Sequence, residues 1–564
     1  MKAQKIIECV PNFSEGRDPQ IITALGECIS KVQGVKLLHV DMGKSTNRMV
    51  ITFAGQPEAV IEAAFQVIRL ASEKIDMRNH KGEHPRMGAT DVCPLIPVQG
   101  LDLEETVEYA KKLGERVGRE LGIPVYLYEA AASATHRQNL ANIRSGEYEG
   151  LEEKMKQPEW RPDYGPSTFN TLSGATVIGA RDFLIAYNVN LNTASVKLAN
   201  EVAFDVRENG RPLKDPQTGI LLKDELGESL RTKGMCPSVK AIGWFIEEYG
   251  FAQVSMNLTN MLQTQLHEAF EACRKSAENY GLLVTGSELV GLLPKKALID
   301  AGKYFLQKQK RSCGLSESEI IQVAVQSLGL NSIQVFHPKE RIIEYMLDDQ
   351  KNPLAESSLE KFAKETASES PAPGGGSVSA YTGTLGAALG AMVANLTAHK
   401  KGYEDQLEYF SEIAEKAQTK MSELLFLVDE DTRAFNGILE AFRLPKSSVD
   451  EKKLRKKAIK SANKYAIEVP YKTMKIAASC LDLIRQMAEK GNPNSISDAG
   501  VAALCIQTAV QGACLNVQIN AMSLDDEEKK KFYLDKAEQL EQKTLKEVAS
   551  ILAYIRKTMN IPIQ

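Results

Sequence analysis

One short segment of the sequence has residue types and a spacing that could bind a metal ion or move a proton. The run RNHKGEHPRMG places His80, Glu83 and His84 in the order H-x-x-E-H, which some zinc peptidases carry on a helix. On a helix the two histidines would share one face. Gly82, however, costs about 1 kcal/mol inside a helix, and Pro85 disfavours helical geometry at the residue before it. The segment is therefore predicted to be a loop, which makes a zinc site the weakest of its interpretations.

Two other interpretations of this loop remain open. Either histidine could be an ordinary hydrogen-bonded loop residue, or one of them could be a catalytic base. The cationic neighbours Lys81 and Arg86 would keep the pKa of His84 near or below about 6.5, so that its ring is neutral at physiological pH. A neutral imidazole can take a proton from a substrate, and we favour this general-base interpretation.

Two further polar clusters follow predicted strands, where α/β proteins usually build their sites. They are VPNFSEGR (10–17) and DMGKSTNR (41–48). Asp41 could orient an imidazole or hold a substrate amine, although Asp41, Gly43 and Asn47 taken singly are equally typical of turns. The side chains suited to hydrogen bonding with a polar ligand are Asn12, Ser14, Ser45, Thr46 and Asn47.

Composition restricts the class of protein. The 564 residues are 43% hydrophobic and 25% charged, as in a soluble globular protein, and the net charge of -4 gives no bulk attraction to nucleic acid or to an anionic membrane. No apolar run approaches the roughly 20 residues that cross a bilayer, so we expect no membrane span. The nine cysteines never form C-x-x-C, which indicates reduced thiols and a cytoplasmic protein without a structural zinc knuckle.

The elements that must position these residues follow a repeated order. Strands are predicted at 6–13, 35–42, 48–55 and 91–98, with helices at 18–31 and 57–75, which gives β-α-β-β-α-β. A helix at 103–121 and a strand at 124–129 follow. The same order recurs with strands at 183–191, 241–248, 252–258 and 282–288 and helices near 194–206 and 265–280, and a helix follows at 295–307. We therefore expect two α/β ferredoxin-like subdomains, with a polar surface excursion at 207–238.

From about Asp348 the residue composition changes, and an almost continuous helical pattern follows. Helices are predicted at 357–369, 376–399, 404–442, 449–490, 498–522 and 526–558, with breaks at 444–446, 469–471 and 491–495. The second half is therefore an all-α bundle. The expected domains are 1–183, 184–342, a linker at 343–356, and 357–564.

The helical half holds two segments of chemical interest. Gly374, Gly375, Gly376 and Ser377 begin a helix very rich in small residues, whose free N–H groups could bind an anion; close helix packing explains most of its other small residues equally well. In LLFLVDEDTRAFN, three acidic residues interrupt an apolar helix, where charge is expensive. Asp429 and Asp431 point to nearly opposite sides, so either the triplet is a solvated face or one of its members serves a site.

These motifs resemble one family closely and in order. Five runs in the first half resemble glutamate formimidoyltransferase: ECVPNFSEGR, STNRMVITFAGQPE, HKGEHPRMGATDVCPLIPV, GEYEGL and GPSTFNTLSGATVIGAR. Four runs in the second half resemble formimidoyltetrahydrofolate cyclodeaminase: APGGGSVSA, LVDEDTRAFN, FRLPK and SDAGVAAL. Together they cover nearly the whole chain in the order of the bifunctional formimidoyltransferase-cyclodeaminase family. The 207–238 excursion departs from that pattern.

The resemblance implies roles for individual residues of the first half. His84 matches the family's catalytic base, and Asp41 is similar to the aspartate beside it. We expect Asn12 and Asn47 to form hydrogen bonds with substrate. We expect Arg48 and Arg86 to bind substrate carboxylates, because a guanidinium pairs with a carboxylate through two hydrogen bonds. Arg181 is a further candidate for this. The folate-binding stretch of the family matches Gly165, Pro166, Ser167, Thr168, Phe169, Asn170, Thr171, Leu172, Ser173 and Gly174.

In the second half the resemblance selects Asp431 as the group that relays a proton to leaving ammonia, and it adds Gly374 to Ser377 as folate-binding residues. It implies two successive reactions of histidine degradation and one-carbon metabolism. The implied cosubstrate is polyglutamylated tetrahydrofolate, and the other substrate is formiminoglutamate. The resemblance further implies that no metal and no nucleic acid take part and that the protein is a homo-oligomer.

Two alternatives come from other classes of protein: a zinc-dependent hydrolase that uses His80 and His84, and a non-catalytic folate-binding protein. The role of His80 stays open.

Overall fold

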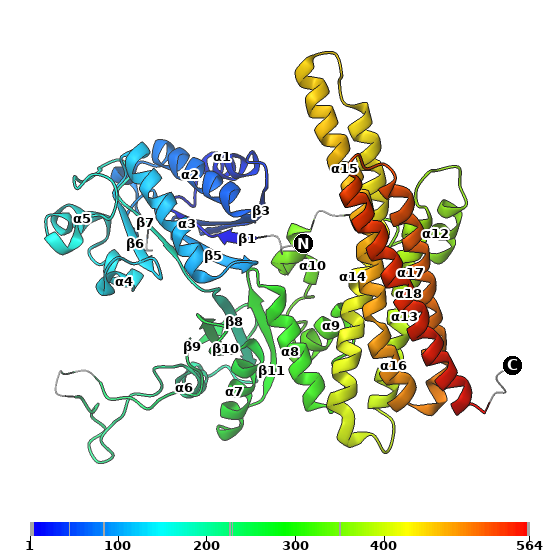
Figure 1. Ribbon diagram of the computed structural model, residues 1–564. Helices are drawn as coiled ribbons and strands as arrows, with labels where there is room; N and C mark the ends of the chain where they lie inside the picture. The colour runs from blue at the N-terminus through cyan, green and yellow to red at the C-terminus, as the bar shows by residue number, and fades with distance from the viewer. Residues whose placement is uncertain are drawn as a thin grey trace. The chain divides into compact units, whose positions relative to one another are not determined.

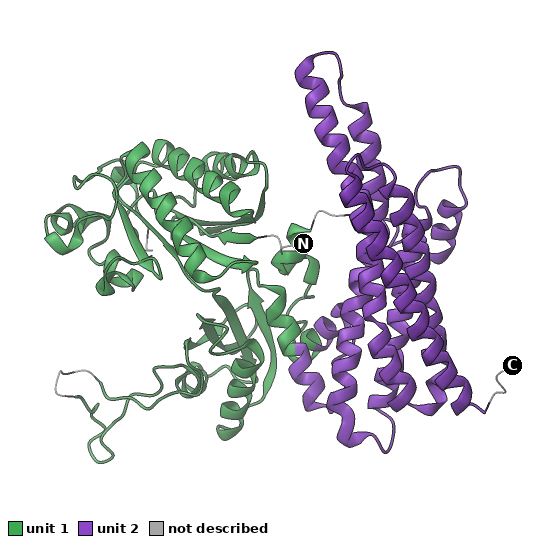
Figure 2. Ribbon diagram, viewed as in Figure 1, with its two compact units in different colours: residues 1–301, 324–349 green, residues 302–323, 350–564 purple. Residues whose placement is uncertain are grey.

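The computed structural model describes residues 5–43, 46–82, 85–224, 227, 229–348 and 351–560. Ser45, Glu83 and His84 therefore lie outside the described residues. The chain forms two compact units, residues 1–301 with 324–349 and residues 302–323 with 350–564 (Figure 2). The division falls within two helices, α8 (Lys295–Lys308) and α9 (Glu317–Ser327).

The first subdomain of unit 1 begins with the predicted β-α-β-β-α-β unit. Its elements are β1 (Ile6–Cys9), β2 (Asn12–Phe13), α1 (Pro19–Ser30), β3 (Val35–Gly43), β4 (Arg48–Gly55), α2 (Pro57–Lys74), β5 (Thr90–Gln99) and α3 (Leu103–Arg116). Strands β1 and β2 together lie between β4 and β5, and β3 pairs with the other side of β4, all antiparallel. Helix α1 begins after Asp18, whose carboxylate accepts hydrogen bonds from the next two free N–H groups. The strand order is that of a ferredoxin-like sheet.

Two further strands extend this sheet. Strand β6 (Val125–Glu129) was predicted, whereas β7 (Thr176–Ala180) was not; β7 pairs in parallel with both β5 and β6. Helices α1, α2 and α3 cover one face of the sheet (Figure 1). Two short helices, α4 (Leu140–Arg144) and α5 (Glu147–Met155), pack on part of the opposite face. The remainder of that face holds the polar residues described below.

The second subdomain repeats the same order, as the sequence predicts. Its elements are β8 (Ile185–Leu191), α6 (Val196–Val206), β9 (Val239–Ile246), β10 (Phe251–Leu258), α7 (Leu266–Asn279) and β11 (Val284–Val290). The sheet order β11-β8-β10-β9 is antiparallel throughout. After α9 come the short helices α10 (Pro338–Arg341) and α11 (Ile343–Leu347). The α/β class and the topology of both predicted units are confirmed.

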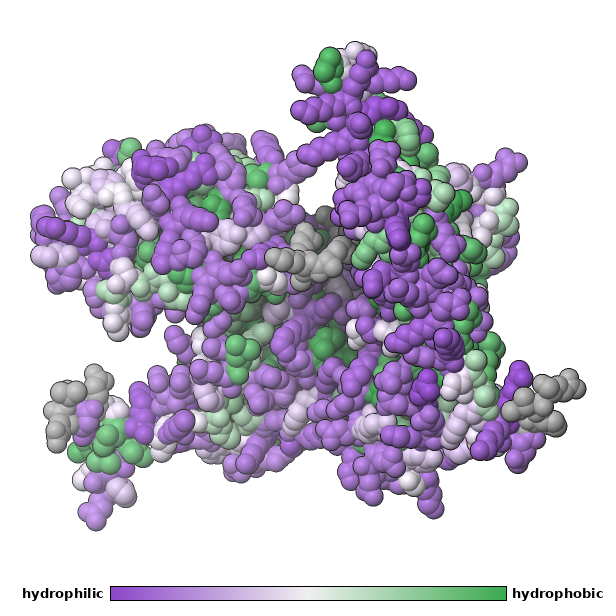
Figure 3. Space-filling view, in the orientation of Figure 1, coloured by the Kyte–Doolittle hydropathy of each residue, from purple (hydrophilic) through white to green (hydrophobic). Residues whose placement is uncertain are grey.

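The 207–238 excursion is an extended arm anchored at its base. Arg211 donates hydrogen bonds to the Asp205 carboxylate and the Tyr280 hydroxyl, both at 2.9 Å, and also pairs with Glu201. Isolated bridges join its two sides. Apolar side chains gather toward its end (Figure 3), and those most exposed there are Ile220, Leu221, Leu222 and Leu230.

The second half is helical, as predicted. Its helices are α12 (Leu359–Thr366), α13 (Gly375–Ala398), α14 (Leu407–Arg443), α15 (Val449–Ser479), α16 (Leu481–Lys490), α17 (Ile496–Ala521) and α18 (Glu527–Thr558). Helix α13 packs against α14 and α17. A β-carbon at Gly383 would lie 3.2 Å from Ala509 and 3.4 Å from Leu424, so small residues let these helices approach closely.

One predicted break is wrong. Helix α15 continues through Pro470, and the interruption falls instead at Cys480. Proline has no N–H group, so the carbonyl four residues earlier, that of Ala466, loses its helical partner. The side-chain amide of Asn520 on α17 donates to this carbonyl at 2.8 Å. A tertiary hydrogen bond therefore keeps the helix intact where the local sequence predicts its end.

The expectation that no apolar run is long enough to cross a bilayer needs correction. Among the described residues, one segment, 493–521, has the length and the mean hydropathy of 1.4 that such a span requires. It contains α17, whose residues Ala499, Ala503, Ile506 and Val510 are fully buried in the bundle core. Enclosure by the other helices explains the apolar residues of the buried half of this segment.

Candidate active sites

In unit 1, polar residues predicted to bind substrate meet on the sheet face away from α1 and α2. Along β4, Met49 and Ile51 point into the helical core, so Arg48 and Val50 point to the other face. The Arg48 guanidinium donates to the Asn12 side chain from β2. Asp41 lies exposed on β3 opposite Val50, and its negative charge favours the charged form of Arg48. The sheet therefore brings together three of the predicted residues that stand apart in sequence.

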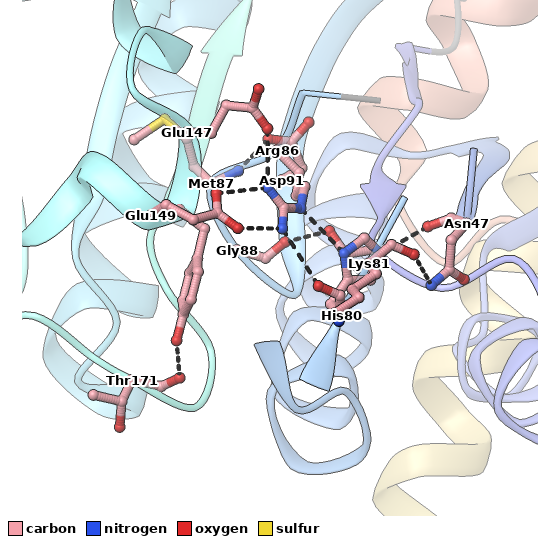
Figure 4. A network of polar contacts seen from close by, with 12 residues as sticks. Asn47, His80, Lys81, Arg86, Met87, Gly88, Asp91, Glu147, Glu149 and Thr171 are labelled. Carbon is pink, nitrogen blue, oxygen red and sulfur yellow. Dashed lines mark hydrogen bonds and ion pairs between the residues drawn. The ribbon is translucent and has the colours of Figure 1, made fainter. Parts of the chain in front are cut away.

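Asn47 connects two loops beside this face (Figure 4). Its backbone has an unusual positive φ of 47°. The side-chain oxygen accepts a hydrogen bond from Gly16 N at 3.1 Å, and the amide donates to Lys81 O at 3.1 Å. Its carbonyl lies 2.9 Å from His80 Nε2. Asn47 therefore joins the loop after β2 to the segment that contains His80.

The other ring nitrogen of His80 is also occupied. Because Nε2 faces a carbonyl, it must carry the proton, which leaves Nδ1 as the acceptor for Arg86 Nε at 3.1 Å. Burial and the positive charge of Arg86 lower the pKa of His80 below its ordinary value. The ring is therefore held neutral, and neither nitrogen is free to bind zinc.

Arg86 pairs with acidic groups of the protein itself. Its Nη2 donates to Glu149 at 2.7 Å and its Nη1 to Glu147 at 2.9 Å, both at the start of α5. The side chain is 9% exposed. These contacts raise the pKa of Arg86, with the hydrogen bond to Glu149 as the largest cause. This arrangement leaves Arg86 poorly placed to bind a substrate carboxylate, and that predicted role stays a prediction.

A buried ion pair lies next to this network and was missed from the sequence. Asp91, which is 2% exposed at the start of β5, accepts a hydrogen bond from Met87 N at 3.0 Å and pairs with Arg144 of α4. Lys154 holds α4 in place by donating to three carbonyls at its end, those of Asn142, Ile143 and Ser145. The available signal was a carboxylate at the first position of the predicted apolar strand 91–98, because a buried carboxylate needs a charged or hydrogen-bonding partner.

Several polar atoms of this region are buried without a hydrogen-bond partner among the described residues. They include Arg48 Nε, Arg144 Nε and Ser173 Oγ. Because buried polar groups are nearly always paired, such atoms mark positions where a polar ligand can bind.

The predicted folate-binding stretch, residues 165–174, is a loop that closes against the segment before β5. Asn170 accepts hydrogen bonds from Leu172 N and Ser173 N, both at 3.1 Å, and Ala89 N donates to Ser173 O at 2.8 Å. Gly174 has a φ of 66° and no room for a side chain beside Met87. Phe169 packs on the ring of Tyr148 at 5.3 Å between centroids. The loop is thus joined to the same region as Arg86 and Glu149.

In unit 2, Asp431 of α14 lies against the first residues of α13. Ser377 Oγ donates to its Oδ2 at 3.2 Å, and Thr432 Oγ1 lies 3.3 Å from the same hydroxyl. A β-carbon at Gly376 would overlap the Asp431 carboxylate, so glycine is required there. Burial raises the pKa of Asp431, and the hydrogen bonds from Ser377 oppose that shift. Three of the predicted residues therefore meet in one place.

The other two acidic residues of the triplet have structural partners. Asp429 accepts hydrogen bonds from Leu354 N at 3.0 Å and Ala355 N at 2.9 Å. Glu430 pairs with Arg433 at 3.1 Å. Asn516 of α17 was not predicted, yet its amide would lie 3.5 Å from a β-carbon at Gly375. Only the acidic residue chosen from the sequence, Asp431, faces the glycine-rich helix start.

Comparisons with known proteins agree with this arrangement of two units. Residues 6–181 match the formiminotransferase domain, N-terminal subdomain, residues 186–348 the formiminotransferase domain, and residues 358–539 formiminotransferase-cyclodeaminase. The formimidoyltransferase-cyclodeaminase of Mus musculus is 44% identical over 93% of this chain and 94% of its own length.

Two shorter proteins each match one half. The glutamate formimidoyltransferase of Thermoplasma acidophilum is 44% identical and covers 56% of this chain and 96% of its own. A crystal structure of formiminotetrahydrofolate cyclodeaminase from Thermotoga maritima is 28% identical, with a TM-score of 0.31, and covers 36% of this chain and 96% of its own. Because matching subdomains fill both halves in order, the chain belongs to the formimidoyltransferase-cyclodeaminase family.

Proposed function

We propose that this chain is a bifunctional folate enzyme of histidine degradation and one-carbon metabolism. Its first reaction moves the formimino group from N-formimino-L-glutamate to the nitrogen at position five of tetrahydrofolate and releases L-glutamate. Its second closes 5-formiminotetrahydrofolate to 5,10-methenyltetrahydrofolate and releases ammonia. The observation that carries the proposal is the match over 93% of the chain to a protein with both activities in its name.

The transfer requires one base and one acid. As the folate nitrogen bonds to the formimino carbon, it loses a proton, and the bond from that carbon to the glutamate nitrogen breaks as this nitrogen gains one. We assign the base to His84, with Asp41 as its orienting partner. Arg48, whose Nε–H is buried and unpartnered among the described residues, is our candidate for binding a substrate carboxylate.

The cyclisation requires a proton for ammonia. The nitrogen at position ten attacks the formimino carbon and gives up its own proton, and the former imino nitrogen, which carries one hydrogen, gains two protons and leaves as ammonia. We assign this proton transfer to Asp431, because burial raises the pKa of its carboxyl group and favours the protonated form that a general acid needs. The free N–H groups at the start of α13 can bind a folate carboxylate.

The two assignments are tested by a pair of variants. We expect His84→Ala to lose transfer while still releasing ammonia from supplied 5-formiminotetrahydrofolate, and Asp431→Asn to do the reverse. If both folded variants lose both activities, the division into two independent sites is wrong. Metal analysis of the purified protein tests the zinc-hydrolase alternative, which requires stoichiometric zinc.

We further propose that the folate is polyglutamylated. A groove of about 610 Å³ between α15 and α18 supports this proposal. Four lysines line it at four-residue spacing on α15, and a string of carboxylates could pair with such a row: Lys452, Lys456, Lys460 and Lys464. Replacing Lys456 and Lys460 by glutamine should raise the KM for pentaglutamylated but not for monoglutamylated tetrahydrofolate. An equal effect on both substrates would remove the groove from this role.

We also propose that the protein is a cytoplasmic homo-oligomer. All nine cysteines are free thiols, as in a reducing compartment. Exposed apolar side chains follow one another along α17, where a second copy could cover them: Val501, Leu504, Leu515 and Ile519. Light scattering of wild type and of Leu515→Lys tests the assembly, because a lysine at the centre of an apolar interface should dissociate it.

A further inference from the structure

We propose that His80 is a positioning residue of the transferase site, which acts through Arg86 and Asn47 and does not touch the reacting atoms. In its neutral form, with the proton on Nε2, the ring links the turn before β4 to the acidic start of α5. This proposal rests on the proposed function, because it concerns the described residues that flank His84, the base assigned there.

The direction of each hydrogen bond fixes the tautomer. The carbonyl of Asn47, 2.9 Å from Nε2, can only accept a hydrogen bond. Arg86 Nε, 3.1 Å from Nδ1, can only donate one. A histidine with the proton on Nδ1 would place two donors against each other on one side and two acceptors on the other. Only the Nε2–H tautomer satisfies both contacts.

The contacts on the amino-terminal side hold residues 80 to 82. Asn47 Nδ2 donates to Lys81 O at 3.1 Å, in addition to the contact of its carbonyl with His80. A β-carbon at Gly82 would overlap the carbonyl of Thr46, so the chain passes directly against the turn before β4. This part of the segment is therefore tied to the sheet edge.

The contacts on the carboxyl-terminal side hold Arg86. Its guanidinium binds Glu147 and Glu149, and Tyr148 N donates to its carbonyl at 2.9 Å. Through Arg86 Nε, His80 is the link between these contacts and those of Asn47 (Figure 4). These contacts thus hold residues 80–82 and Arg86, which are described residues on either side of positions 83 and 84.

Protonation of His80 would break this link. An imidazolium has N–H groups at both ring nitrogens, so Nδ1 would face the Arg86 N–H with a proton of its own. The charged groups that act on the ring are Arg86 and Arg17, which oppose its protonation, and Glu15 and Glu149, which favour it. Because His80 is half-buried next to Arg86, the neutral form prevails at physiological pH.

Two substitutions at this position distinguish positioning from direct catalysis. Glutamine can reproduce both contacts, with its amide donating to Asn47 O and its oxygen accepting from Arg86. Phenylalanine fills the space but makes neither contact. We expect His80→Phe to lower the transferase kcat by about 10- to 100-fold, as misplacement of a catalytic group does, and His80→Gln to retain most of it.

The pH profile supplies a readout that a merely structural role would not change. In wild type, transferase kcat should fall at acid pH as His80 gains a proton. In His80→Gln the side chain at position 80 cannot titrate, so the part of the acid limb that His80 causes should disappear and only the titration of the base His84 should remain. Fluorescence of the two tryptophans, Trp160 and Trp244, both in unit 1, reports that this unit is folded in each variant. His337→Phe, at an exposed histidine, is the matched control.

Equal losses of kcat in His80→Gln and His80→Phe would overturn the proposal, because they would indicate that the imidazole itself reacts. Full activity of His80→Phe would overturn it as well. Failure of the proposed function has a different signature: His84→Ala would then retain transfer, whatever the variants at His80 do.

Discussion

The hydroxyl of Ser377 donates a hydrogen bond to the carboxylate of Asp431 at 3.2 Å, across 54 residues of sequence. The carboxylate reaches this position because Gly376, one residue earlier, has no side chain to exclude it. The N-terminus of α13 and the middle of α14 therefore build one site from one acid, one hydroxyl and free N–H groups.

Gly376→Ala should abolish cyclodeaminase activity while transfer continues. The added β-carbon would overlap the Asp431 carboxylate, which must then move away from Ser377. A displacement of this kind is expected to cost roughly 100-fold in kcat. Gly390→Ala on the same helix is the control, since its β-carbon would meet Ile484 at an ordinary 3.6 Å. Equal activity of the two variants would show that Gly376 has no such role.

Asp429→Asn and Asp431→Asn should differ in stability. Asp429 accepts two backbone N–H groups, and an asparagine turns one acceptor into a donor, so unfolding free energy should fall by about 1–3 kcal/mol. Asp431 is a buried acid whose ionised form is disfavoured, so its replacement should leave stability unchanged or higher. Urea unfolding followed by circular dichroism separates them; a larger loss in Asp431→Asn would contradict these assignments.

Glu8 should make unit 1 less stable as pH rises. It is 3% exposed, and burial raises its pKa from 4.5 to about 7, with Arg181 opposing the shift. The folded form thus binds its proton more tightly, so this contribution is complete below pH 4.5 and is lost as pH rises through 7. The loss amounts to about 3 kcal/mol.

Tryptophan fluorescence measures this effect in unit 1 alone, because the chain has two tryptophans, Trp160 and Trp244, both in that unit. Between pH 5 and pH 8, wild type should lose more unfolding free energy than Glu8→Gln. Glu73→Gln, an exposed residue of α2, should behave as wild type does. Identical pH dependence in wild type and Glu8→Gln would refute the effect.

Arg144→Met should destabilise unit 1 and impair transfer. It leaves the Asp91 carboxylate, 2% exposed, without its charged partner, and breaking a buried ion pair in this way costs about 3–5 kcal/mol. Arg78→Met removes an ion pair with Asp76 whose arginine is 58% exposed, so it should cost less than about 1 kcal/mol. Thermal unfolding followed by tryptophan fluorescence compares the two, and equal melting temperatures would contradict the prediction.

Much of the fold could be predicted from local patterns, and the exceptions have specific causes. The strand β7 was missed because residues 176–180 follow a loop rich in glycine and hydroxyl residues and are too short for a clear period. The break at Pro470 was wrong because the amide that completes the helix comes from Asn520, 50 residues later in the chain. Half of the apolar window that contains α17 is buried in the bundle, and no window of its own sequence reveals which half.

The candidate sites divide in the same way. Helix spacing indicated that Asp429 and Asp431 cannot both enter one pocket, and the resemblance to the family selected Asp431. In the structure Asp429 accepts hydrogen bonds from two backbone N–H groups instead. The sequence could not assign His80 or Arg86, because their partners, Asn47, Glu147 and Glu149, come from other elements.

The sequence by itself determined the order of elements, the two α/β units, the helical bundle and the motifs that carry chemistry, because periodicity and backbone preference are local properties. Only the tertiary structure decided that both ring nitrogens of His80 are occupied, that Arg48 Nε has no partner among the described residues and that the Asp431 carboxylate is buried at a helix start. Hydrogen bonding and desolvation depend on every neighbour in space, and most of those neighbours are distant in the chain.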